Sequence, residues 1–195
     1  QKTSEGNVKD NKKDGKWTRW HRNGQIESEK NYKDNNLVSQ TDYHYYGNGQ
    51  MSEKINYKDN KRDGKATYWY ENGQIEEEVI YKNDKKVSRT IYTYHENSQK
   101  QQEGNYKDHK KDGKWTWWYE NGQIQNEGNY KEGGLVSKTR YEYYSNGQIK
   151  SEKNYKDGKY DGKVTYWYED GQIKTERIYK EGKEIGGGGS IITRY

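Results

Sequence analysis

One aromatic residue stands three positions before the first residue of each Asn-Gly or equivalent turn. The identity of this aromatic residue alternates strictly between Trp and Tyr. This stripe consists of Trp20, Tyr45, Trp69, Tyr94, Trp118, Tyr143 and Trp167. The turn glycines are spaced alternately by 25 and 24 residues, with Ser98 replacing one of them, so the full period is 49 residues. A fixed period of this size indicates an array of supersecondary units, each contacting mainly its neighbours.

The composition limits how such an array can be stabilised. Only 26% of the 195 residues are hydrophobic, and Phe, Pro and Cys are absent. A chain so poor in aliphatic residues would ordinarily be predicted to be disordered. However, the net charge is only +5, and 22 Tyr and 7 Trp recur at fixed positions. Because aromatic rings bury large areas, we predict an ordered but thin fold.

The segment 65–81 shows the unit as a hairpin. Asn72-Gly73 lies between two runs of β-branched and aromatic residues, which is a strong signal for a two-residue type I′ turn. This turn would place Tyr70 opposite Ile75 and Trp69 opposite Glu76. The second strand of each hairpin ends at a tyrosine: Tyr32, Tyr57, Tyr81, Tyr106, Tyr130, Tyr155 or Tyr179. A polar segment then leads into the next hairpin.

Strand alternation assigns side chains to two faces. We expect one face to carry the residue after each stripe position, the Ile or Met after each turn, and the terminal tyrosines. The other face would carry the stripe and a series that alternates between Thr and Tyr: Thr18, Tyr43, Thr67, Tyr92, Thr116, Tyr141 and Thr165. A one-residue bulge would instead move the stripe onto the face of the Ile series.

The segment 57–75, with the sequence YKDNKRDGKATYWYENGQI, resembles the bacterial variant of the MORN repeat, a family also described as an antitoxin component. The resemblance covers essentially the whole chain. It implies an elongated, twisted, single-layer antiparallel sheet with roles in binding, scaffolding or surface display, and it supplies no catalytic residues. Classical MORN repeats have more glycine in their strands; the segments 103–106 and 127–130 come closest to that pattern.

The aromatic stripe has two interpretations. It could be a ladder on which sugar rings stack, or it could brace a sheet that lacks aliphatic residues through cross-strand aromatic pairs. We favour the brace, because a thin sheet needs those contacts whatever it binds. The stripe nevertheless remains the candidate binding site.

Other site chemistries find less support in the sequence. The repeated Asp pairs could suggest calcium, but two carboxylates separated by basic residues supply too few ligands, and turns explain them better. These pairs are Asp10/Asp14, Asp59/Asp63, Asp108/Asp112 and Asp157/Asp161. Acidic residues dispersed through the strands argue against a basic stripe for nucleic acid. The histidines His21, His44, His95 and His109 form no recurring catalytic set. We therefore expect no enzyme activity, metal or cofactor.

The ends of the chain keep the repeat register. Residues 1–9 (from Gln1 to Lys9) correspond to the second strand of a hairpin. Residues 191–195 (from Ile191 to Tyr195) correspond to a first strand, preceded at 186–190 by a Gly-Ser segment that is either an engineered linker or a natural loop. Such edges could pair head to tail between copies. The alternative, which we favour, is that the chain is a fragment cut from a longer repeat array at hairpin boundaries.

Together these patterns predict an all-β, elongated, twisted single-layer antiparallel β-meander of about sixteen strands, with the hairpin array at 1–185. The expected function is a non-enzymatic repeat module that binds a protein or an extended polymer, within an exported or surface protein of a bacterium. Alternatives are cell-envelope glycan binding through the Trp/Tyr ladder and an antitoxin-like interaction with a toxin. We expect neither nucleic-acid binding nor membrane insertion, because no apolar run is long enough to span a bilayer.

Overall fold

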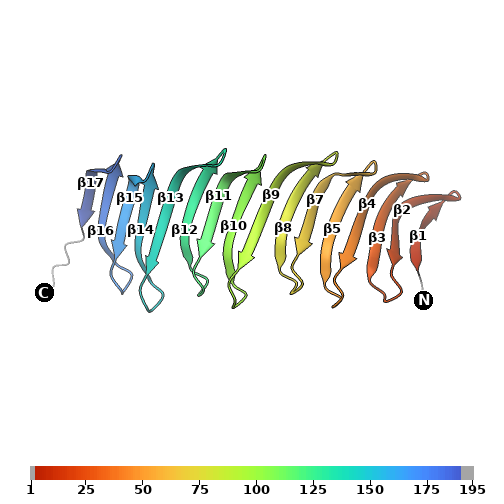
Figure 1. The fold of residues 1–195 in the computed structure, drawn as a ribbon, viewed down its shortest axis with the longest axis horizontal. Helices are drawn as coiled ribbons and strands as arrows, with labels where there is room; N and C mark the ends of the chain where they lie inside the picture. The colour runs from red at the N-terminus through yellow and green to blue at the C-terminus, as the bar shows by residue number, and fades with distance from the viewer. Residues whose placement is uncertain (1–2, 190–195) are drawn as a thin grey trace. The chain divides into compact units, whose positions relative to one another are not determined.

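The computed structural model describes residues 3–189, which divide into two compact units between Ile91 and Tyr92 (Figure 1). The described residues contain strands and no helix. The strands that begin in the first unit are β1 (Ser4–Lys9), β2 (Lys12–Trp20), β3 (Ile26–Lys33), β4 (Asn36–Tyr45), β5 (Met51–Lys58), β6 (Lys61–Arg62), β7 (Gly64–Trp69), β8 (Ile75–Lys82) and β9 (Lys85–Tyr94). Those of the second unit are β10 (Lys100–Lys107), β11 (Lys110–Trp118), β12 (Ile124–Lys131), β13 (Gly134–Tyr143), β14 (Ile149–Lys156), β15 (Lys159–Trp167), β16 (Ile173–Lys180) and β17 (Lys183–Gly189).

Within each unit, successive strands pair antiparallel with their sequence neighbours. This confirms the predicted single-layer meander of hairpins. The described residues hold 17 strands rather than about sixteen. The difference arises at Asp63, whose backbone N–H donates to the Asn56 carbonyl at 3.0 Å and divides one strand into β6 and β7, both paired with β5.

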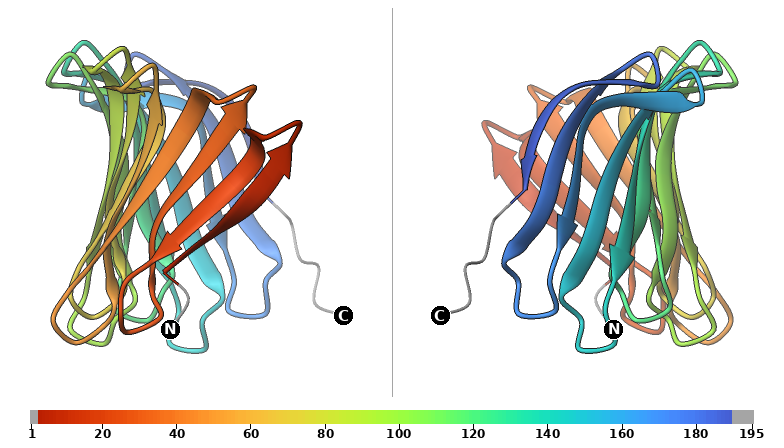
Figure 2. Two further views of the ribbon diagram at one scale, coloured as in Figure 1. Left: turned by 90° about the vertical axis from the view of Figure 1, so that its right-hand side faces the viewer. Right: turned by 90° about the vertical axis from the view of Figure 1, so that its left-hand side faces the viewer.

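Two kinds of turn lie at opposite ends of the strands (Figure 2). The turns that link one repeat to the next contain two residues, both with positive φ, as at Asp10 (49°) and Asn11 (58°). This is the type I′ geometry, which favours Asn, Asp and Gly because they tolerate the left-handed region. The polar segment between predicted hairpins is therefore itself a tight hairpin.

The predicted two-residue turn at Asn-Gly is wrong. The Gly73 N–H donates to the Tyr70 carbonyl at 2.9 Å, and the Tyr70 N–H donates to the Gln74 carbonyl at 2.8 Å, so the loop has three residues. Only Gly73 has positive φ (85°) in this loop, as expected for a type I turn followed by a glycine bulge. Asn-Gly suits both geometries, so the dipeptide alone could not distinguish them.

The pairing next to this loop also differs from the prediction. Trp69 lies opposite Ile75, not Glu76, while Tyr68 lies opposite Glu77. Glu76 is the extra residue of a bulge, which restores the predicted register beyond it. The Ile series therefore shares a face with the stripe and the Thr/Tyr series, which we call the stripe face. The terminal tyrosines remain on the opposite face, which we call the core face.

Little volume is buried, and aromatic residues provide much of it. In the first unit Ile55, Ala66, Val79 and Tyr81 form a buried cluster on the core face, packed against Tyr57 and Tyr68. In the second unit Trp115 is fully buried on the same face. Its indole lies over Gly104 of the neighbouring strand. A glycine opposite a tryptophan thus lets a single layer of sheet bury a large ring.

Basic side chains cover these aromatic groups. The Lys111 Nζ lies 3.9 Å from the Trp115 ring centroid and 5.0 Å from that of Tyr130. Lys13 and Arg62 occupy the same repeat position and lie over Trp17 and Tyr81, each at 4.4 Å. A cation over a ring contributes about 0.5–1 kcal/mol at exposed sites. Long basic side chains therefore replace the second layer that a sheet would otherwise need.

The glycine run near the end of the described chain is part of β17. Gly186 lies opposite Ile178 and Gly189 lies opposite Thr175, so these glycines extend the ladder with β16. The predicted linker or loop at 186–190 thus overlaps a strand over its first four residues. Ser190 and the predicted terminal strand at 191–195 lie outside the described residues, as do residues 1–2 of the predicted N-terminal edge.

Candidate functional site

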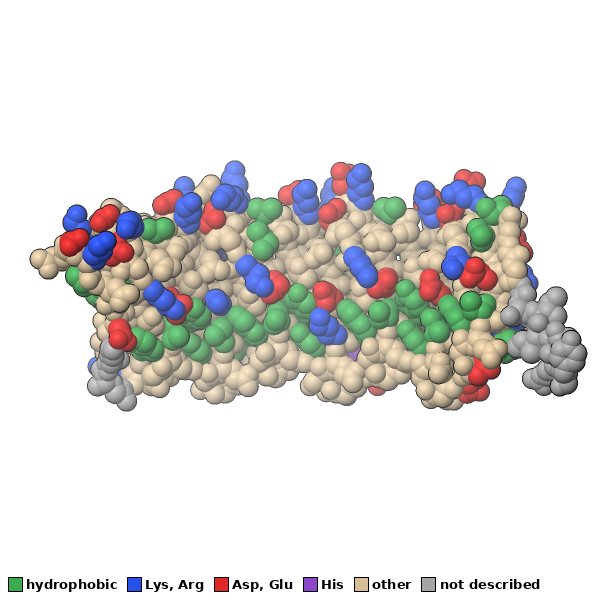
Figure 3. Space-filling model, turned by 180° about the vertical axis from the view of Figure 1, so that it is seen from behind, with side chains coloured by type: hydrophobic (Ala, Val, Ile, Leu, Met, Phe, Trp, Pro, Cys, Tyr) green, Lys and Arg blue, Asp and Glu red, His purple; other side chains and the backbone are tan. Residues whose placement is uncertain are grey.

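Every stripe residue is the last residue of its strand and is half-buried. Burial raises the pKa of the Tyr45 and Tyr143 phenols. Two stripe tyrosines pack edge-on against a ring of the preceding repeat, the one that directly follows its stripe residue. His21 contacts Tyr45 with 6.2 Å between ring centroids, and Tyr119 contacts Tyr143 at 6.3 Å. These contacts brace adjacent repeats. In the view of Figure 3, hydrophobic side chains gather in a band beside basic and acidic ones.

The residue after each stripe position links one repeat to the backbone of the next. The Tyr46 hydroxyl donates to the Trp69 carbonyl at 2.5 Å, and the Tyr144 hydroxyl donates to the Trp167 carbonyl at 2.7 Å. His95 holds the same position, with its Nε2 at 2.9 Å from the Trp118 carbonyl oxygen. Because a carbonyl only accepts, this His95 nitrogen carries the hydrogen. The loops of adjacent repeats are therefore fixed relative to each other.

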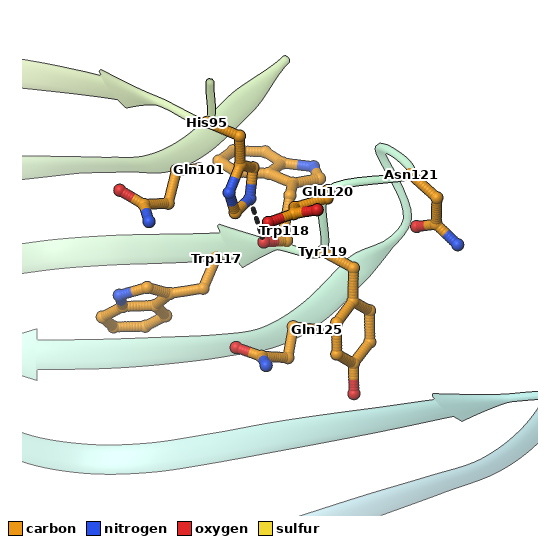
Figure 4. Close-up of a pocket in the computed structure, with 8 residues that line it drawn as sticks. All are labelled: His95, Gln101, Trp117, Trp118, Tyr119, Glu120, Asn121 and Gln125. Carbon is orange, nitrogen blue, oxygen red and sulfur yellow. Dashed lines mark hydrogen bonds between the residues drawn. The ribbon is translucent and has the colours of Figure 1, made fainter. Parts of the chain in front are cut away.

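An open hollow of about 620 Å³ lies beside these loops in the second unit (Figure 4). Its lining combines aromatic rings with uncharged polar groups and one carboxylate. The lining residues are His95, Gln101, Trp117, Trp118, Tyr119, Glu120, Asn121 and Gln125. We call it the first hollow. Its volume falls within the range that is typical of ligand pockets.

Strand geometry explains how the first hollow is built. Trp117 lies two residues after Trp115 on β11 and so projects to the core face. Its Nε1 donates to the Gln102 Oε1 at 2.9 Å, which fixes the ring. On β12, Trp117 lies opposite Asn126 and Trp118 lies opposite Ile124, so Gln125 is the extra residue of a bulge. Bulges re-aim side chains, and here Gln125 lies beside Trp117.

A second hollow of about 440 Å³ lies one repeat further along the chain. It shares Tyr119 and Asn121 with the first hollow, so the two are contiguous. Glu142 and Lys150 occupy the repeat positions that Trp117 and Gln125 hold in the first hollow. The Glu142 carboxylate accepts hydrogen bonds from Lys153 and Ser151, both at 2.9 Å, and these bonds hold the pKa of Glu142 below its ordinary value. At these two positions the second hollow therefore carries charged side chains, whereas the first hollow carries the neutral Trp117 and Gln125.

The family of the chain follows from a comparison with known repeat families. The MORN repeat variant matches it seven times, at residues 13–34, 43–59, 62–83, 90–108, 111–132, 138–157 and 160–181. The chain belongs to the MORN repeat variant family. As a tandem MORN array it is a repeat module of the binding or scaffolding type. The family resemblance predicted from segment 57–75 is thereby confirmed.

Comparisons with individual proteins add no further identification of this MORN array. Curated proteins provide no match. Among solved structures, "Crystal Structure of TcdB2-TccC3-Cdc42" aligns over 85% of the chain with 14% identity and a TM-score of 0.42. "Structure of Photorhabdus luminescens Tc holotoxin pore, Mutation TccC3-D651A" aligns over 92% with 9% identity and a TM-score of 0.35. The array spans 9% and 12% of those chains, and TM-scores below 0.5 do not establish a shared fold.

The stripe face of the MORN array carries regular ion pairs. Lys16 pairs with Glu29, and the same repeat positions pair Lys114 with Glu127 at 2.6 Å. The Tyr43 hydroxyl donates to the Glu29 Oε2 at 3.0 Å. Burial alone would raise the pKa of Glu29, but hydrogen bonds from Lys16 and Tyr43 outweigh it and lower that pKa. Burial and the Glu29 carboxylate together raise the pKa of Tyr43 to about 12.

The repeated Asp pairs serve the turns and the links between strands. Asp10, Asp59, Asp108 and Asp157 begin the two-residue turns with φ between 47° and 50°. Asp14 pairs with Lys33 at 3.2 Å, and Asp161 pairs with Lys180 at 3.1 Å. Within residues 3–189 no group of three or more His, Cys, Asp or Glu side chains converges as a metal site. Over the same residues, no helix suited to crossing a membrane is present.

Three tryptophans outside the predicted stripe proved structurally important, and sequence reasoning missed them. Trp17 and Trp115 fill the core face over glycines, and Trp117 forms the wall of the first hollow. A signal for Trp117 exists in the repeats. Its position holds Arg19, His44, Tyr68, Thr93, Trp117, Glu142 and Tyr166 in successive copies. Because this position varies among the copies while its neighbours recur, its side chain does not serve a structural role that every repeat needs.

Proposed function

We propose that this MORN array is a non-enzymatic module that binds an extended partner, a protein or a polymer, along the loop side of its core face. The observation that supports this most directly is the contiguity of the two hollows, which share Tyr119 and Asn121. Each repeat advances the sheet by two strands, or about 10 Å. A ligand that follows the hollows would therefore meet a new set of side chains at each such step.

Rigidity favours this role. The loops that line the hollows are held by the His95 contact to the Trp118 carbonyl and by a 2.5 Å hydrogen bond from Asn97 to the Glu120 carbonyl. A surface that is ordered before binding loses little conformational entropy when a partner binds. The differences between hollows would then determine which segment of the partner lies where.

The test uses Tyr119, which lines both hollows. A glycan array and a library of extended peptides are probed with the purified chain, and ligands are ranked by length. We expect ligands long enough to span both hollows to bind more tightly than shorter ones, and Tyr119→Ala to weaken them about tenfold, as loss of a well-packed interface aromatic does. Tyr70→Ala, at the same repeat position in the first unit, is the matched control. Equal affinity for long and short ligands, or no bound member of either library, would contradict the proposal.

A further inference from the structure

We propose that the first hollow is a binding site for an uncharged sugar, with one pyranose ring stacked on Trp117. The inference rests on the proposed function, because it names the ligand class for one part of the same surface. It differs from the Trp/Tyr ladder predicted from the sequence, since the stacking ring lies outside the stripe.

The platform is a fixed aromatic ring. Trp117 is half-buried, and its Nε1 is bound to Gln102, so the ring does not rotate freely. The Trp115 ring lies 5.9 Å from it at an interplanar angle of 31°, which supports one side. A pyranose ring has an apolar face of C–H groups that stacks on the face of an aromatic ring, and Trp117 lines the hollow where such a ring could lie.

The polar groups beside the platform match sugar hydroxyls. Gln101 and Gln125 lie on the strands to either side of Trp117 (Figure 4). The Gln101 Oε1 accepts from the Thr93 hydroxyl at 3.3 Å, and the Gln125 Oε1 accepts from the Asn126 amide at 3.2 Å. Among the described residues, neither Nε2 has a hydrogen-bond partner in the protein, so each can donate to a ligand.

An acceptor completes the set. Because the His95 Nε2 donates to the Trp118 carbonyl, its Nδ1 is an acceptor in the neutral ring. Among residues 3–189, the Tyr119 hydroxyl makes a single long contact, 3.4 Å, to the Tyr141 carbonyl. A hydroxyl both donates and accepts, so a sugar can satisfy two amide donors and an imidazole acceptor together.

The charge of the first hollow selects against anionic ligands. Its lining contains the carboxylate of Glu120 and no Lys or Arg. A nucleotide could also stack on Trp117, but its phosphate would meet a single ammonium, that of Lys111, whose Nζ lies 5.4 Å from the Trp117 ring centroid, whereas nucleic-acid grooves are positively charged throughout. The second hollow offers an internal comparison, because Glu142 stands in place of the platform and Lys150 in place of Gln125.

The experiment titrates the chain with cellotetraose, chitotetraose, maltotetraose and adenosine monophosphate, followed by tryptophan fluorescence and saturation-transfer NMR. We expect at least one tetrasaccharide to bind with a dissociation constant of about 1 mM or below. Gln125→Ala should weaken it about fivefold, the loss of roughly one hydrogen bond, while Lys150→Ala, the matched position in the second hollow, should have no effect. Trp117→Ala should abolish binding, and Trp117→Tyr should retain part of it, since tyrosine stands at this position in two other repeats.

Several outcomes overturn the inference: no tetrasaccharide binds at millimolar concentration, adenosine monophosphate binds in preference, or Gln125→Ala and Lys150→Ala behave alike. Circular dichroism of each variant separates lost binding from lost folding, and the Gln125→Ala result stands even if Trp117→Ala is unstable. Titration with the matching monosaccharide separates the two proposals: if it binds as tightly as the tetrasaccharide, the sugar site is supported and the extended-partner proposal is contradicted. If only peptides bind, and more tightly as they lengthen, the extended-partner proposal is supported and the sugar site is contradicted.

Discussion

The indole of Trp115 lies directly over Gly104, and a Cβ added to that glycine would fall 2.0 Å from the Trp115 Cδ2. The two residues are opposite each other on β11 and β10, and the Trp115 Nε1 donates to the Asn105 carbonyl at 3.0 Å. Trp17 lies over Gly6 in the same way. A glycine on one strand thus makes room for a large ring on the next, and this is how the single-layer sheet buries the indole of Trp115 completely.

The first prediction concerns this pair. Gly104→Ala should lower the free energy of unfolding by about 3 kcal/mol, because overpacking forces the buried ring and its hydrogen bond out of place. Urea unfolding followed by tryptophan fluorescence measures the change. Gly47→Ala is the control, because its new methyl group would meet nothing within 4 Å; it should change stability by less than about 0.5 kcal/mol. Equal effects of the two substitutions would show that Trp115 does not need the glycine.

The second prediction concerns the links between loops. Tyr144→Phe removes the 2.7 Å hydrogen bond from the Tyr144 hydroxyl to the Trp167 carbonyl. It should cost about 1 kcal/mol, the usual net contribution of one such bond. Tyr168→Phe is the matched control one repeat later, because among the described residues the Tyr168 hydroxyl has no hydrogen-bond partner. If thermal unfolding shifts equally for both variants, the link does not stabilise the array.

The repeat pattern predicted most of this architecture, because a period of 49 residues and recurring turn residues depend on local chemistry. The failures also have local causes. A type I turn with a glycine bulge and a type I′ turn accept the same Asn-Gly pair, so the face of Ile75 depended on the bulge at Glu76. The stripe does not mark the core: Trp115 is buried on the opposite face of the sheet. Its burial depends on the absence of a side chain at Gly104 on another strand.

The candidate site was less predictable than the fold. The stripe was chosen because it is regular, yet regularity marks what every repeat needs for its structure. The first hollow instead depends on Trp117, Gln101 and Gln125, where the copies differ. The bulge that turns Gln125 toward Trp117 is a backbone feature that side-chain alternation does not reveal.

The third prediction concerns acid. The Lys153 and Ser151 hydrogen bonds lower the pKa of Glu142 below its ordinary value of 4.5. A carboxyl with a lowered folded-state pKa stabilises fully above pH 4.5, and this contribution is lost as the pH falls through the folded-state value. Glu142→Gln should therefore reduce the urea midpoint at neutral pH and converge with the unmodified chain in acid. Glu71→Gln, in an exposed turn, should show no such convergence; a constant gap for Glu142→Gln across the pH range would contradict the argument.

The fourth prediction concerns alkali. Burial, the hydrogen bond to Glu29 and the charge of that carboxylate raise the pKa of Tyr43 to about 12, and burial with the nearby Glu127 does the same for Tyr141. A raised folded-state pKa stabilises fully below the ordinary value of 10.0, and the contribution is lost as the pH rises from there to about 12. Absorbance of tyrosinate should show one group of tyrosines ionising near 10 and another near 12. Glu29→Gln should move one tyrosine from the second group toward the first, because a neutral amide no longer opposes the phenolate, while Glu96→Gln should leave both groups unchanged. A single ionisation step near 10 for all tyrosines would show that the Tyr43 to Glu29 contact does not persist in solution.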